Sequence, residues 1–245
     1  MKNIGLIGCG NIAETYFRAQ EYFKNINFVA CADINLDAAK KTAEQYNIAA
    51  LSVDEILNDK NVDIILNLTI PQAHYEISKR ALEANKHVYC EKPMSVKFDD
   101  AKELLNLAKK NSLYIGNAPD TFLGGGGQLT RNLIDNNDIG QVLTGNFIFA
   151  FPGVQDFHPS PESWFQEGGG PVIDMGPYFF TTLVNLLGPV KNIRGRGAKF
   201  FDKREYKAGP KKGETFNVDI PTSYMFNIEF QNKAIIQGFI SFDVL

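Results

Sequence analysis

A short apolar segment followed by closely spaced small residues constrains the fold of this chain more than any other feature. Residues 2–7 are typical of a strand, and a glycine turn follows before a helix expected to run to about Lys24. In the pattern Gly-x-Gly-x-x-Ala, the first glycine permits a tight turn, the second lets the backbone approach a pyrophosphate, and the alanine lets helix and strand pack closely. The helix N-terminus favours phosphate. The residues predicted to contact a dinucleotide here are Gly8, Gly10, Asn11, Ile12 and Ala13.

A second apolar strand, residues 27–33, ends in an acid twenty residues beyond Ala13. The Asp33 carboxylate could accept hydrogen bonds from both adenosine ribose hydroxyls and would repel a 2′-phosphate. No Arg or Lys follows until Lys40, so NAD is favoured over NADP. Asp33 could instead cap the helix expected at residues 36–46, and the two roles are compatible.

Composition excludes several classes of protein. The 245 residues are 44% hydrophobic and 22% charged, with a formal net charge of −3, which argues against nucleic acid as a main partner. No apolar run approaches the length of a membrane helix, and the first residues lead directly into a strand without a signal segment. Three cysteines in or beside expected buried strands favour a reducing compartment and free thiols. We therefore expect a cytoplasmic protein without a membrane partner.

Strands and helices alternate through the first half of the chain, which predicts a doubly wound parallel sheet. Ligands of such sheets bind beyond the carboxyl ends of the strands. That rule selects the glycine turn, Asp33, the turn Thr69–Pro71 and the segment Glu91–Pro93. The strands after the first two are expected near residues 48–51, 61–69, 87–90 and 113–117, and the helices after residue 46 at 52–58, 71–85 and 98–110.

The pattern changes at about Thr121, where alternating strands, a Pro- and Gly-rich loop and fewer helices begin. We therefore expect a dinucleotide-binding domain over residues 1–121 and an α+β domain over 122–245, with an open, largely antiparallel sheet and a helix on one face. The expected strands are 141–151, 190–201, 216–230 and 234–244, with helices at 128–135 and 174–187 and a hairpin region at 203–213.

Two groups of residues could carry chemistry. Lys92, between Glu91 and Pro93, follows the fifth strand, where its ammonium could bind a substrate hydroxyl and stabilise alkoxide character as hydride leaves. A solvated surface lysine is an equally good interpretation. Asp174 and Tyr178 follow a glycine run and lie four residues apart, on one face of a helix. Asp174 could alternatively be an N-cap, and Tyr178 a packed aromatic residue.

Taken together, the glycine turn, the Glu91-Lys92-Pro93 motif and the glycine-rich loop leading to Asp174 and Tyr178 resemble the Gfo/Idh/MocA family of oxidoreductases (glucose-fructose oxidoreductase and inositol dehydrogenase relatives). The resemblance covers essentially the whole chain. It implies an N-terminal Rossmann domain and NAD(P)-dependent hydride transfer between nicotinamide and a sugar, cyclitol or related polyol.

The resemblance also assigns roles to residues. It implies catalytic roles for Lys92 and Asp174, whereas relatives usually carry a proton-accepting His where this chain has Tyr178. An ordinary tyrosine pKa of about 10 makes a poor base near neutrality unless a cation such as Lys92 lowers it. We expect Tyr178 to exchange the hydroxyl proton, Lys92 to polarise the substrate oxygen and Asp174 to fix the geometry.

Further binding residues are expected on the same grounds. Family members place the turn and helix that hold Thr69, Pro71 and His74 beside the ribose and nicotinamide, so these three residues join Glu91 and Lys92 in the expected cofactor site. Trp164 and His158 are candidates for a sugar-facing wall, although an ordinary loop residue is the more common role for such a histidine. The three histidines are far apart and have no other ligand at metal-binding spacing, so no metal is expected.

The sequence departs from its relatives in length as well. Relatives are longer, and this chain stops directly after an apolar strand, so we expect a sheet that is incomplete at its C-terminal end, with an unprotected edge. Family members commonly pair through the open face of this sheet, which implies a homo-oligomer. The short C-terminus and Tyr178 keep a second interpretation open, namely a non-catalytic, dinucleotide-sensing regulatory protein of the same fold.

Overall fold

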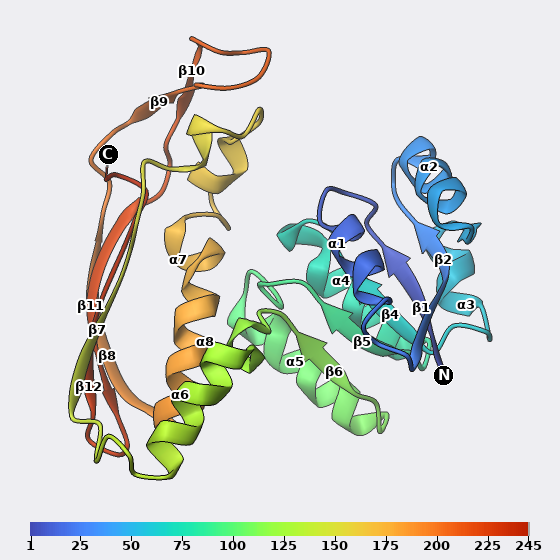
Figure 1. Ribbon diagram of the computed structural model, residues 1–245. Helices are drawn as coiled ribbons and strands as arrows, with labels where there is room; N and C mark the ends of the chain where they lie inside the picture. Colours follow the sequence, from blue (N-terminus) through green and yellow to red (C-terminus); the bar gives the residue numbers. More distant parts are fainter. Residues whose placement is uncertain (245) are drawn as a thin grey trace. The chain divides into compact units, whose positions relative to one another are not determined.

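The first six strands of the computed structural model, which describes residues 1–244, form one parallel sheet (Figure 1). They are β1 (Lys2–Ile7), β2 (Ile26–Ala32), β3 (Ala49–Ala50), β4 (Ile64–Asn67), β5 (His87–Cys90) and β6 (Ile115–Asn117). Their order in the sheet is β3-β2-β1-β4-β5-β6. The winding reverses between β1 and β4, which is the arrangement of a doubly wound Rossmann sheet and confirms the predicted fold class.

Helices cover both faces of this sheet. They are α1 (Ala13–Ala19), α2 (Leu36–Tyr46), α3 (Val53–Asn58), α4 (Pro71–Glu83) and α5 (Phe98–Lys110). On one face, Phe17 of α1 packs in a buried cluster with Leu66 of β4. On the other face, Leu82 and Leu104 of α4 and α5 pack with Ile65. Because neighbouring residues of β4 point into opposite clusters, the strand is apolar on both faces from Ile64 to Leu66.

Local signals place several helix ends. Ser52 and Glu55 form a capping box at the start of α3, and Pro71 occupies the first turn of α4. Helix α1 ends at Ala19, well before the expected Lys24. The side chain of Gln20 accepts a hydrogen bond from the amide of Phe28 at 3.2 Å, so the chain is already turning back toward β2.

The chain divides after Ala118, and the second compact unit, which starts at Pro119, is built on a four-stranded sheet. Its strands are β7 (Thr144–Ala150), β8 (Val190–Ala198), β11 (Ser223–Phe230) and β12 (Ile235–Ser241), in the order β7-β12-β11-β8. The pairs of β11 with β12 and β8 are antiparallel, and β12 pairs with β7 in parallel. The predicted open, largely antiparallel sheet is therefore confirmed.

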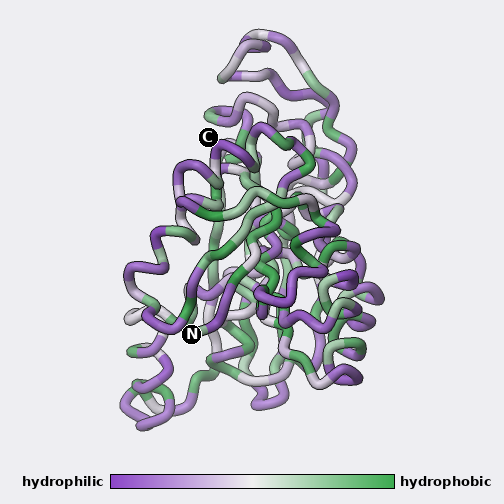
Figure 2. The backbone as a smooth tube through the Cα atoms, turned by 90° about the vertical axis from the view of Figure 1, so that its right-hand side faces the viewer, coloured by the Kyte–Doolittle hydropathy of each residue, from purple (hydrophilic) through white to green (hydrophobic). Residues whose placement is uncertain are grey.

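Helices and a hairpin complete this unit. They are α6 (Gly125–Asp135), α7 (Pro171–Asp174), α8 (Gly176–Leu187), the 3-10 helices η1 (Thr121–Leu123), η2 (Val154–Asp156) and η3 (Glu162–Phe165), and the paired strands β9 (Lys203–Glu205) and β10 (Thr215–Asn217). In Figure 2 the hairpin of β9 and β10, at the top of the view, is largely hydrophilic, whereas hydrophobic residues concentrate in the strands of the sheets.

One face of the four-stranded sheet is covered and the other is open. Phe180 and Leu183 of α8 pack against Phe226 and Ile228 of β11 in a buried cluster. Alternate residues of the strands point to the opposite face, where strand register aligns one row across all four strands. This outer row consists of Ile148, Phe239, Met225 and Arg196.

Two elements predicted for this unit are interrupted in the structure. The helix expected at 174–187 begins at Pro171 as α7 and is interrupted at Met175, so Asp174 lies in the last turn of α7. Its interpretation as an N-cap is therefore wrong. The strand expected at 216–230 is split into β10 and β11, and Pro221, which cannot donate a ladder hydrogen bond, lies between the two.

The hairpin of β9 and β10 is anchored by a buried ion pair. The Arg204 guanidinium donates to the Asp243 carboxylate, and both side chains are largely buried. Asp243 also accepts hydrogen bonds from the hydroxyls of Thr222 and Ser223. Removing one partner of such a pair typically costs about 3–5 kcal/mol, because the other charge stays buried without compensation.

Among the described residues, no helix combines the length and the apolar character needed to cross a membrane.

Replacing Leu104 with Ala tests the packing of the parallel sheet. Leu104 is 0% exposed, whereas its neighbour Leu105 is 51% exposed. We expect Leu104→Ala to lower the free energy of unfolding of this unit by about 2–5 kcal/mol, because the substitution leaves a cavity between α5 and the sheet. Leu105→Ala, the matched control, should change it by less than about 1 kcal/mol. Urea denaturation followed by circular dichroism measures both, and equal losses would contradict the assigned packing.

Candidate functional site

The glycine turn after β1 lies against the end of β4. Gly8 has a φ of +105°, and a Cβ atom there would lie 2.6 Å from the backbone carbonyl of Leu68. Only glycine fits this conformation and this contact. A Cβ atom on Gly10 would meet nothing within 4 Å, so the space in front of Gly10 is open to a ligand. Ala13 is buried against the sheet, as the third position of the pattern requires.

Asp33 joins this turn to the end of β2. Its Oδ2 accepts a hydrogen bond from the amide of Cys9 at 2.7 Å, and its Oδ1 accepts one from the amide of Asn35 at 2.7 Å. The N-cap of α2 is Asn35, whose side chain accepts from the amides of Asp37 and Ala38. The interpretation of Asp33 as the cap is therefore wrong. Each carboxylate oxygen keeps a second lone pair that could accept a hydrogen bond from a ligand hydroxyl.

The turn after β4 is organised by buried polar groups. The Thr69 hydroxyl donates to Asn67 at 2.7 Å, and the Asn67 amide donates to the backbone carbonyl of His74 at 3.0 Å. His74 is 1% exposed, and its two ring nitrogens lie 2.6 Å and 2.9 Å from the carbonyl oxygens of Pro93 and Thr69. His74 therefore holds the turn after β4 to the loop after β5.

Lys92 follows β5 in a loop that is fixed at several points. The side chain of Glu91 accepts from the Tyr16 hydroxyl at 2.7 Å and from the amide of Lys92 at 2.9 Å. The amide of Glu91 donates to the carbonyl of Asn67 at 2.9 Å, and the side chain of Asn117 donates to the carbonyl of Glu91 at 3.0 Å. These contacts position the backbone that carries Lys92 at the carboxyl edge of the sheet.

In the second unit, the glycine run links Trp164 to Asp174. The amide of Gly170 donates to the carbonyl of Trp164 at 2.8 Å, and the amide of Asp174 donates to the carbonyl of Gly170 at 2.9 Å. A Cβ atom on Gly169 would lie 2.2 Å from the carbonyl of Ser163, so this approach also requires glycine. Tyr178 follows in the first turn of α8.

The two candidates for a sugar-facing wall lie together. The rings of His158 and Trp164 have centroids 4.7 Å apart and are tilted by 55°. The His158 ring accepts a hydrogen bond from the amide of Ser160 at 3.1 Å, which fixes its orientation. The structure thus brings together the pair predicted from the sequence. Lys92 belongs to the first unit, whereas Asp174, Tyr178 and this pair belong to the second.

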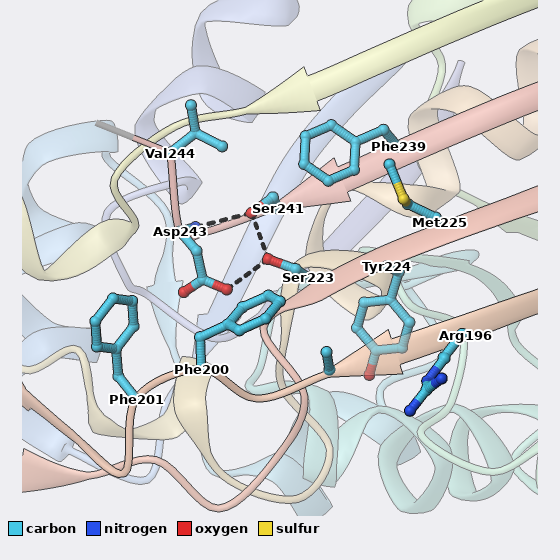
Figure 3. A pocket seen from close by; sticks show the side chains of 11 residues that line it. Arg196, Phe200, Phe201, Ser223, Tyr224, Met225, Phe239, Ser241, Asp243 and Val244 are labelled. Atoms are coloured by element: carbon cyan, nitrogen blue, oxygen red, sulfur yellow. Dashed lines mark hydrogen bonds between the residues drawn. The ribbon is translucent and has the colours of Figure 1, made fainter.

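A pocket of about 760 Å³ lies on the outer face of the four-stranded sheet (Figure 3). Its lining includes the aromatic rings of Phe200, Phe201, Tyr224 and Phe239. The carboxylate of Asp243 is already hydrogen-bonded to Arg204, Thr222 and Ser223. None of the predicted site residues lines the pocket, and its character is that of an apolar surface.

Strand order, glycine turn and terminal acid together define a dinucleotide-binding Rossmann domain, followed by a separate α+β domain. Sequence comparison identifies the family. Residues 2–117 match the NAD-binding Rossmann-fold domain of an oxidoreductase family, and residues 128–244 match the GFO/IDH/MocA C-terminal domain. The chain belongs to the Gfo/Idh/MocA oxidoreductase family, as the sequence motifs predicted.

Curated relatives include dehydrogenases of sugars and cyclitols. The chain is 27% identical to a D-xylose dehydrogenase of Paenarthrobacter nicotinovorans over 69% of its own length and 46% of the relative. It is 31% identical to an inositol 2-dehydrogenase of Salmonella typhimurium over 57% of its own length and 43% of the relative. The matched stretch spans 39% to 64% of the first four curated relatives, so the chain corresponds to only part of their length.

Solved structures share the fold. A levoglucosan dehydrogenase in complex with NADH and L-sorbose superposes with a TM-score of 0.87 at 22% identity, covering 100% of this chain and 68% of the other.

The residues present fit an NAD cofactor. Gly8 allows the backbone of the turn to pack against β4, the space before Gly10 is open, and Asp33 presents a carboxylate beside both. The chain therefore combines a family NAD-binding domain with a turn shaped for a dinucleotide. Among residues 1–244, no three His, Cys, Asp or Glu side chains come together as a potential metal site.

Sequence reasoning missed two residues that shape the site. Asn67 is a fully buried amide inside an otherwise apolar strand, and an uncompensated polar group there would be costly, so its position alone signals a role. Tyr16 contacts Glu91 from α1, far away in sequence, and no local pattern indicates that contact.

Asp33→Asn tests the ribose-binding role of the acid. We expect NADH to bind about tenfold more weakly and the preference for NADH over NADPH to narrow, because the negative charge and one acceptor are lost. Asp37→Asn, which removes an exposed acid from the first turn of α2, is the matched control. Calorimetric titration with both cofactors provides the measurement. An unchanged NADH affinity in Asp33→Asn would contradict the assignment.

Proposed function

We propose that the protein is an NAD-dependent oxidoreductase that transfers hydride between nicotinamide and a sugar, cyclitol or related polyol. The observation that carries the proposal is the position of Lys92. It follows β5 at the carboxyl edge of the sheet, near the reversal of winding between β1 and β4. The loop that carries it is held by Tyr16, Asn67 and His74. A rigid loop that carries the Lys92 ammonium at this edge is suited to polarising a substrate oxygen.

The cofactor would be held by the residues at the carboxyl ends of the strands. Gly8 and Gly10 would allow the pyrophosphate to approach the backbone, with Asn11, Ile12 and Ala13 completing the turn, and Asp33 would bind the ribose. Thr69, Pro71 and Glu91 would border the nicotinamide half. Because both ring nitrogens of His74 are within hydrogen-bond distance of backbone carbonyls, its contribution would be to fix the two loops. The bound NAD supplies the hydride chemistry.

Three side chains would handle the substrate hydroxyl. Lys92 would bind the oxygen and stabilise its negative charge as hydride leaves the carbon. Tyr178 would accept the hydroxyl proton, which requires a neighbouring cation to lower the phenol pKa, and Asp174 would orient the pair. Trp164 and His158 would offer ring faces to the C–H surface of the substrate. Support for this arrangement comes from the family motifs and from the link between Trp164 and Asp174 through Gly170.

The alternative is a dinucleotide-sensing regulatory protein without turnover. It is favoured by Tyr178, which stands where relatives usually carry a proton-accepting His. A panel of sugars and cyclitols assayed for NADH absorbance separates the two functions. Turnover of one member supports the oxidoreductase, whereas saturable NADH binding without turnover of any member supports the sensor.

Lys92→Met tests the catalytic role of the lysine. We expect kcat to fall about a hundredfold or more, because the cation that stabilises the developing alkoxide is removed. The Kd for NADH should change less than about twofold. Lys97→Met, which alters an exposed lysine a few residues along the chain, is the control and should retain activity. Unchanged turnover in Lys92→Met would rule out the role.

We also propose that the chain forms a homo-oligomer through the open face of the four-stranded sheet. Ile148, Phe239 and Met225 of the outer row form an apolar stripe across three strands, and Ile148 is 67% exposed. An exposed apolar stripe beside the pocket of Figure 3 is typical of a surface that a partner covers.

Met225→Glu tests this surface. We expect the variant to shift from oligomer to monomer in light scattering coupled to size-exclusion chromatography, because a charge would be buried in the interface. Leu129→Glu, which introduces the same charge at an exposed position of α6, is the control and should leave the oligomer intact. A parent chain that is monomeric at micromolar concentration would contradict the proposal.

A further inference from the structure

Two of the three cysteines lie together at the glycine turn. Cys9 lies between Gly8 and Gly10, and Cys31 lies in β2. Both pack in the cluster on the sheet face that α1 and α2 cover. The sulfur of Cys9 is 3.7 Å from the carbonyl oxygen of Ala32, the residue after Cys31, which places Cys9 beside the end of β2 that carries Cys31.

The two thiols differ in exposure and acidity. Cys9 is partly exposed, whereas Cys31 is 0% exposed, with its sulfur 3.3 Å from the carbonyl of Ala39 on α2. Interaction with the Cys31 thiol, and to a smaller extent with Thr42, holds the pKa of Cys9 below its ordinary value. Interaction with Cys9, together with burial, raises the pKa of Cys31. The accessible sulfur is therefore the one that more readily becomes a thiolate, which is the nucleophilic form.

We propose that Cys9 and Cys31 are a redox modification site, at which a peroxide converts the two thiols to a reversible disulfide inside the dinucleotide-binding turn. The Cys9 thiolate attacks one peroxide oxygen. An S–O bond forms and the O–O bond breaks, so the sulfur is oxidised to a sulfenic acid, and the reduced oxygen leaves as hydroxide and is protonated to water.

The buried partner completes the reaction. The Cys31 sulfur attacks the Cys9 sulfur, the S–S bond forms, the S–O bond breaks, and the departing hydroxide takes the Cys31 proton to leave as water. In sum, two thiols and one hydrogen peroxide give one disulfide and two waters. The packing of both cysteines in one cluster favours this second step over further oxidation of Cys9.

The disulfide would change the turn itself. The amide of Cys9 donates to Asp33, and Gly8 on one side is pressed against the backbone of Leu68. A covalent link from Cys9 to β2 would therefore require a shift of the turn backbone, which has little room to move. We expect weaker binding of NADH in the oxidised form, a consequence that rests on the cofactor site proposed above.

The test compares reduced and oxidised forms of the full chain. The reduced protein is treated with hydrogen peroxide, free thiols are alkylated, and peptides are mapped by mass spectrometry, while NADH affinity is measured on the same samples. We expect a Cys9–Cys31 cross-linked peptide, a rise in the Kd for NADH of about tenfold or more, and recovery of both by dithiothreitol.

Two variants sharpen the result. Cys31→Ala removes the buried partner, and we expect it to bind NADH like the parent when reduced and to lose the reversible response. Cys90→Ala is the matched control, because Cys90 is also a fully buried thiol of the same sheet, and burial raises its pKa to about 12. It should respond to peroxide like the parent. If Cys31→Ala does not fold, Cys31→Ser replaces it.

Two outcomes would overturn the proposal. One is oxidation of Cys9 to sulfinic or sulfonic acid without a cross-link to Cys31, and the other is a cross-linked form whose NADH affinity lies within twofold of the reduced form. Failure of the proposed function is recognised separately. A reduced protein that does not bind NADH would contradict the cofactor site, while the mass of the cross-linked peptide still decides whether the disulfide forms.

Discussion

The close approach of Gly8 to the backbone of Leu68 is the contact on which the carboxyl edge of the sheet depends. It brings the turn after β1 against the end of β4, where the winding of the sheet reverses. A residue with a side chain would have to displace β4 or leave the left-handed conformation, so this position fixes the identity of the residue. The space before Gly10 and the carboxylate of Asp33 acquire their positions from this contact.

A polar framework extends the same edge toward β5. Asn67 and His74 hold the turn after β4, and His74 reaches the carbonyl of Pro93. Tyr16 then holds Glu91 from the opposite side. These groups are mostly buried, so each hydrogen bond must offset the cost of removing its polar groups from water. The framework is rigid only when all its members are paired. The loop that carries Lys92 is thus positioned by residues that do not themselves need to touch a substrate.

Much of the fold could be predicted from the sequence, because its signals are local. The alternation of strands and helices, the capping box at Ser52 and the proline that opens α4 all act within a few residues of where they occur. The interruption at Met175 and the parallel pairing of β7 with β12 depend on packing between distant segments, and no periodicity encodes them. In the site, the glycines and Asp33 can be recognised from their spacing in the sequence. The contact of Tyr16 with Glu91 cannot, because it forms only in the folded sheet.

The buried pair of Arg204 and Asp243 links the hairpin of β9 and β10 to the segment directly after β12. Because separation would leave two charges in a poorly solvated position, the hairpin gains little by detaching alone. Exchange of the hairpin's amide protons should therefore require opening of the chain around Thr222 and Ser223 as well, because these two residues bind the same carboxylate. Such an opening would register in hydrogen exchange as one cooperative step rather than as independent fraying.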